Sequence, residues 1–87
     1  MKVRNMTSTR GNYVPNQFII NNNGEDIFQS YETTIAKFGV DGTVTLDEKA
    51  LDYSRTTSKY LYMFLNRDRK EIKKRIENGT YRIENMN

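Results

Sequence analysis

The sequence contains no cysteine and no histidine. The absence of cysteine excludes disulfide bonds and thiolate metal sites. The absence of histidine removes the commonest general base, the commonest metal ligand and the usual base of a nucleophilic triad. The chain also has no glycine-rich phosphate-binding loop, and its hydroxyl side chains have no base to activate them. We therefore predict a protein that is not an enzyme and that carries no cofactor and no metal ion.

Long apolar runs are missing as well. No stretch approaches the length of a membrane span, and the N-terminus has no apolar signal core. The 87 residues are 36% hydrophobic and 29% charged, which is typical of one small globular domain with a single core. We expect a soluble protein of the cytoplasm of whatever cell makes it, with no membrane contact.

The basic residues are concentrated at the two ends of the chain, although the net charge is only +3. Residues 1–16 carry three basic residues and no acidic one, whereas residues 17–53 carry seven acidic residues and two basic ones. Residues 67–82 are basic again. Because residues 1–16 are polar and show no hydrophobic period, they predict an extended N-terminal arm that precedes a single domain of residues 17–87.

Segments rich in β-branched and aromatic residues predict four strands in series, joined by turns rich in Asn, Asp and Gly. The strands cover residues 17–21, 27–31, 33–38 and 43–46, and a short fifth segment covers 80–83. In the first strand, alternation places Phe18 and Ile20 on one face. In the fourth strand, Val44 and Leu46 are expected on the buried face and Thr45 outside.

Two helices are predicted after the fourth strand. Ser54 is the expected N-cap of the first helix, since its hydroxyl oxygen accepts a backbone N–H of the first turn. The apolar face of that helix consists of Tyr60, Leu61, Phe64 and Leu65. The second helix spans residues 69–78 and starts after the capping residue Asp68. Together the elements predict an α+β fold: a four- to five-stranded antiparallel sheet with two helices packed on one face, in the order ββββααβ.

Two basic stripes on the predicted helices are the candidate partner-binding surfaces. The stripe on the first helix consists of Arg55, Lys59 and Tyr62, at helical spacing. The ridge on the second helix consists of Arg69, Lys70, Lys73 and Lys74. Such stripes can contact acidic proteins or phosphates. They are more often the ordinary solvated faces of surface helices, and the sequence leaves both interpretations open. The acids Asp47, Glu48 and Asp52 precede the first helix, where its dipole favours negative charge.

The string DYSRTTSKY occupies residues 52–60 and is followed by Phe64 and Leu65. Together with RNMTS at 4–8, VPNQF at 14–18, FQSY at 28–31 and VTLD at 44–47, it resembles a family of small uncharacterised proteins of Gram-positive phages and plasmids. The resemblance extends over nearly the whole chain. It implies an accessory protein of a mobile element, and it implies no catalytic residues.

Small phage proteins without enzymatic motifs often act by binding host proteins. By analogy we expect a non-enzymatic accessory protein that binds a host protein or nucleoprotein complex, such as an anti-CRISPR or another counter-defence inhibitor. The alternative is a small nucleic-acid-binding protein that uses the basic second helix and the N-terminal arm.

Overall fold

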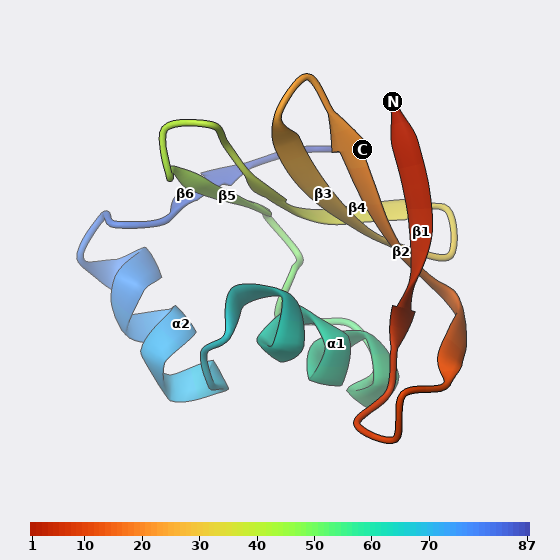
Figure 1. Ribbon diagram of the computed structural model, residues 1–87. Coiled ribbons are helices and arrows are strands. Elements are labelled where there is room, and N and C mark those ends of the chain that lie inside the picture. Colours follow the sequence, from red (N-terminus) through yellow and green to blue (C-terminus); the bar gives the residue numbers. More distant parts are fainter.

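The computed structural model describes residues 1–87. Its elements are β1 (Lys2–Thr7), β2 (Tyr13–Asn22), β3 (Glu25–Ser30), β4 (Thr33–Phe38), β5 (Val44–Asp47), α1 (Arg55–Leu65), α2 (Arg69–Glu77) and β6 (Arg82–Glu84). The six strands form one sheet in sequence order. Both helices lie on the same side of that sheet, below it in Figure 1. The predicted α+β class, with two helices on one face, is therefore confirmed.

The sheet differs from the predicted one in two respects. It has six strands in place of four or five, and it is mixed, because β6 pairs with β5 in parallel. Between β5 and β6 the chain passes through both helices on one side of the sheet. A helical crossover of this kind returns the chain in its starting direction, whereas a hairpin turn would reverse it.

The additional strand is β1, and it comes from the segment that we predicted as an extended arm. Residues 2–7 are extended but belong to the sheet, where Val3 lies opposite Ile20 and Asn5 opposite Phe18. Met6 is buried in the core. An edge strand with much of its surface in solvent needs few apolar residues, so this segment shows almost no hydrophobic period. The prediction of an arm outside the domain was wrong for residues 2–7, and also for residues 13–16, which begin β2.

The hairpin between β2 and β3 matches its sequence signal. Asn23 and Gly24 both have positive φ, at 54° and 84°, which is the backbone that a tight hairpin turn requires. The predicted strand 33–38 coincides with β4. Local turn chemistry therefore fixes the central strand pairs.

The buried face of β2 is the opposite of the one that carries Phe18 and Ile20. Gln17 and Ile19 are buried, and the neighbouring residues are only half-buried. Gln17 Nε2 donates to Ser30 Oγ at 2.9 Å, and Ser30 Oγ lies 2.8 Å from Thr57 Oγ1 of α1. A chain of polar side chains thus joins β2, β3 and α1 inside the core. Because the buried face includes Gln17, apolar alternation did not reveal it.

All four residues of β5 are buried, so the prediction that Thr45 points into solvent was wrong. Asp47, two residues further along, shares the face of Thr45. Its Oδ1 accepts hydrogen bonds from Met86 N at 3.0 Å and Asn87 Nδ2 at 3.2 Å. Asn87 also bonds both backbone groups of Thr34 in β4. The C-terminal residues therefore lie across this end of the sheet and contribute to its burial.

The Asp47 carboxylate is a structural anchor with a perturbed pKa. Burial opposes its ionisation, but hydrogen bonds from Met86, Lys49, Asn87 and Tyr53 outweigh that effect and hold its pKa below 3.8. A lowered folded-state pKa contributes stability above the unfolded value, and this contribution is lost as the pH falls through the folded value.

We therefore expect Asp47→Asn to lower the free energy of unfolding at pH 7 by about 1–3 kcal/mol, since the amide cannot accept from all these donors. The difference between wild type and variant should narrow as the pH is lowered below 3.8. Urea unfolding across pH 2–7 measures it. The control is Glu48→Gln, because Glu48 is an exposed acid next along the chain. Equal effects of the two changes would show that the network adds nothing.

The core lies between the helices and one face of the sheet. Ile19, Phe28, Ala36 and Leu46 form a row across β2 to β5. The ladder shifts register after Phe28, so Ile35 has no direct partner there and is fully buried as well. Leu61 of α1 and Ile72 of α2 pack against this row from the helices. The buried core has thirteen members in all.

The two helices begin at the predicted caps. Thr57 N donates to Ser54 Oγ at 3.3 Å, and Glu71 N donates to Asp68 Oδ1 at 2.8 Å. Asn66 ends α1 in the left-handed conformation, so that only residues 66–68 separate the helices. This short link places the first turn of α2 beside α1. Neither helix is long and apolar enough to cross a membrane.

Candidate functional site: a basic groove on α1

A groove of about 520 Å³ lies along the side of α1 that does not face the core. We call it the basic groove. Its lining residues are Tyr53, Arg55, Ser58, Lys59, Tyr62 and Arg69. Three of the six are cationic, two are tyrosines and none is acidic. Four of them are residues that the sequence singled out as partner-binding.

Helical geometry explains how the groove residues of α1 come together. Arg55, Lys59 and Tyr62 follow one another at spacings of four and three, so they share a stripe of the helix. The buried residues Leu61 and Leu65 occupy a different stripe and face the core. The basic groove is thus the polar side of an amphipathic helix, and the apolar side fixes its direction.

Arg69 reaches the groove from the first turn of α2. Its Nη1 donates to the carbonyl oxygen of Leu51 at 3.1 Å, which ties the guanidinium to the loop before α1. The sequence placed Arg69 on a separate ridge, because the angle between the two helices cannot be read from either helical period. In the structure, Arg69 lies beside the stripe of Arg55 and Lys59 and lines the same groove.

The three groove cations have no acidic partner. The ion pairs of the molecule are Lys37 with Glu25 and Arg75 with Glu71. Lys59 Nζ lies 5.5 Å from the ring centroid of Tyr60, and this contact leaves its charge uncompensated. A positive groove without internal ion pairs can bind an anion without first breaking an ion pair.

Tyr53 lines the groove and is hydrogen-bonded to the buried Asp47. Its hydroxyl donates to Asp47 Oδ2 at 3.2 Å. Burial, together with the negative charge of Asp47, raises the pKa of this phenol above 10.0. The hydroxyl therefore stays protonated at neutral pH, and the ring is held in place as an uncharged wall.

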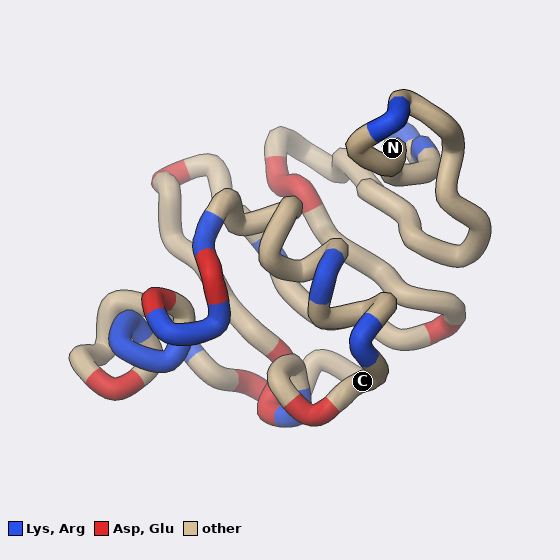
Figure 2. Tube along the Cα trace, turned by 90° about the horizontal axis from the view of Figure 1, so that it is seen from below, with Lys and Arg blue, Asp and Glu red and all other residues tan.

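The other residues of the predicted ridge do not join the groove. Lys70 and Lys74 lie about 160° and 200° around α2 from the buried Ile72, and both face solvent. Lys73 borders a neighbouring hollow, which shares Arg69 with the basic groove and whose lining includes the acids Asp47, Glu48 and Asp52. In Figure 2, which views the helix side, the basic positions of α1 and of α2 form separate groups. The structure therefore divides the seven predicted residues into four that converge and three that do not.

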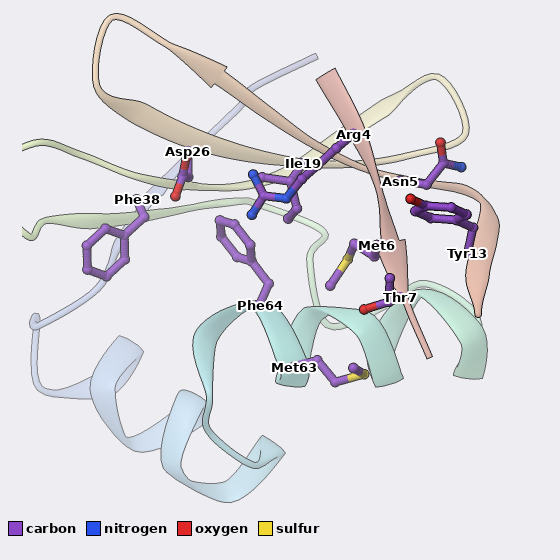
Figure 3. Close-up of a pocket in the computed structure, with 10 residues that line it drawn as sticks. All are labelled: Arg4, Asn5, Met6, Thr7, Tyr13, Ile19, Asp26, Phe38, Met63 and Phe64. Carbon is purple, nitrogen blue, oxygen red and sulfur yellow. The ribbon is translucent and has the colours of Figure 1, made fainter. Parts of the chain in front are cut away.

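A second concave site was not predicted from the sequence. A cleft of about 580 Å³ opens between β1, β2 and the C-terminal half of α1. Figure 3 shows Met6, Ile19 and Phe64 around it, with the guanidinium of Arg4 extending across Ile19. Phe38 and Met63 at its rim are substantially exposed. The cleft needs β1 in the sheet, because Arg4, Asn5, Met6 and Thr7 line it, and that strand was not predicted from the sequence.

Comparison with known proteins places the chain in a family. A family model, described as a family of unknown function (DUF8033), matches residues 1–79. No curated protein and no solved structure matches the chain. The matched segment includes β1 to β5, both helices and every residue of the basic groove. The chain is therefore a member of the DUF8033 family.

Proposed function

We propose that the protein is a non-enzymatic accessory protein of a phage or other mobile element, and that it binds a host macromolecule in the cytoplasm through the basic groove. The observation that carries the proposal is the convergence of Arg55, Lys59 and Arg69, without ion pairs, beside two tyrosines. The resemblance of the DYSRTTSKY string to proteins of phages and plasmids supports the mobile-element origin.

The first candidate partner is an acidic surface of a host protein. Tyrosine and arginine are the residues that most often dominate binding energy at protein interfaces. Arg69 is held by Leu51 before any partner binds, so less side-chain freedom is lost on docking. A counter-defence inhibitor, an anti-CRISPR protein included, would use the groove in this way.

The second candidate is single-stranded nucleic acid, and the two tyrosines favour it. Aromatic rings beside cations are the usual platform for unpaired bases and their phosphates. With three groove cations the electrostatic contribution is modest, because log affinity for single strands falls with log salt by about 0.7 per phosphate contact.

Capture from a Gram-positive host lysate, with and without nuclease, distinguishes the candidates. We expect a specific protein to be retained after nuclease treatment, because its acidic surface binds the groove directly. Recovery that disappears with nuclease, together with salt-dependent binding of a labelled single-stranded oligonucleotide, would favour the second candidate. Failure to retain any partner under either condition would contradict both.

A further inference from the structure

We propose that β1 is a docking edge for an acidic, extended segment of a partner protein, which adds to the sheet as a further strand. β1 stands at the end of the strand order and pairs with β2 on one side only. A hollow of about 590 Å³ lies beside the first residues of β1. Its lining residues are Lys2, Val3 and Arg4, with Asn21 of β2. The backbone N–H and C=O groups on the free side of an edge strand are the template for strand addition.

The charges of β1 indicate what kind of strand fits. Residues 1–24 contain Lys2, Arg4 and Arg10 and no acidic residue, and none of the three forms an ion pair. Lys2 and Arg4 share the face of the sheet that the helices cover, because Arg4 lies opposite the buried Ile19, while Val3 points to the other face. Arg4 extends into the cleft of Figure 3, where its guanidinium lies across Ile19 on the side of Asp26 and forms no ion pair.

The repeat of a β-strand turns these positions into a recognition pattern. Residues two apart on one face lie about 6.7 Å apart in every strand, so an added strand keeps step with β1. Two acids separated by one residue then meet Lys2 and Arg4, and an apolar residue between them meets Val3. The pattern expected in the partner is therefore acid–apolar–acid in an extended segment.

The same charges disfavour a second copy of this chain as the added strand. Pairing β1 with itself would bring Lys2 and Arg4 of both copies together, and cations on an edge strand oppose such association. The repulsion that prevents self-pairing becomes attraction for an acidic strand. The opposite edge, β6, has three residues and includes Glu84, so it offers a shorter template of mixed charge.

An NMR titration with a synthetic peptide tests the proposal. The probe is a capped peptide of alternating Glu and Val, compared with its Lys–Val counterpart and with an alternately N-methylated Glu–Val peptide that cannot complete a ladder. With the Glu–Val peptide only, we expect saturable chemical-shift changes of the β1 amides. Those β1 amides that do not bond β2 should also exchange their hydrogens more slowly. Arg4→Gln should weaken binding about tenfold.

Arg10→Gln is the matched control, because it removes the same charge from the adjacent β1–β2 turn, and it should leave the affinity nearly unchanged. Thermal melts establish that both variants stay folded. No saturable binding of the Glu–Val peptide would overturn the proposal, as would equal binding of the N-methylated peptide or equal effects of the two variants. The edge and the basic groove lie on different elements, so failure of one leaves the other standing.

Discussion

Phe28→Ala is expected to destabilise the protein by about 3–5 kcal/mol, the usual cost of removing a buried phenylalanine. Phe28 is fully buried in the central row of the sheet. Its ring stacks on Phe64 of α1, with centroids 5.8 Å apart and planes at 29°. The substitution therefore leaves a cavity between sheet and helix and removes the main aromatic contact that holds α1 on the sheet.

Phe38→Ala is the matched control for this prediction, because Phe38 is 45% exposed at the end of β4. It should cost less than half as much as Phe28→Ala. Denaturant unfolding of the three proteins gives both values. A cost below about 1 kcal/mol for Phe28→Ala would mean that the ring is not packed between sheet and helix.

Deletion of residues 1–7 is the second change with a large expected effect. It removes every β1–β2 pair, takes Met6 out of the core and leaves β2 as a bare edge. Small domains are stable by only about 5–15 kcal/mol in total, so we expect the cooperative thermal transition to be lost or to move far below that of the full chain.

The double variant Lys2→Gln and Arg4→Gln tests whether the deletion acts through lost strand pairing or through lost charge. It keeps the backbone of β1 and should melt close to wild type, because both side chains are exposed. Melting followed by circular dichroism measures all three proteins. If the deletion variant melted like the full chain, β1 would be the dispensable arm that the sequence suggested.

Local signals in the sequence were sufficient for the inner strands and for both helices. The Asn23-Gly24 turn, the hydroxyl of Ser54 and the carboxylate of Asp68 each act within a few residues. Elements of this kind follow from turn and capping chemistry. They were predicted because no distant contact is needed to specify them.

Elements that depend on distant contacts were missed. β1 is held by β2, the burial of Gln17 depends on Ser30 and Thr57, and Asp47 is covered from the C-terminus. Tertiary contacts such as these override the local pattern. The same holds for the candidate site. The stripe on α1 could be predicted from its helical period, but the position of Arg69 in the groove depends on how α2 packs against α1.

The double variant Arg55→Gln and Lys59→Gln gives the most direct measurement of whether the basic groove binds the partner. Its matched counterpart is Lys70→Gln with Lys74→Gln, which removes the same charge from the exposed side of α2 at the same spacing. The quantity measured is the affinity for the partner captured from nuclease-treated lysate. We predict a loss of about tenfold or more for the groove variant and little change for its counterpart. Equal losses, or a loss confined to the Lys70 and Lys74 variant, would contradict the assignment of the groove as the binding site.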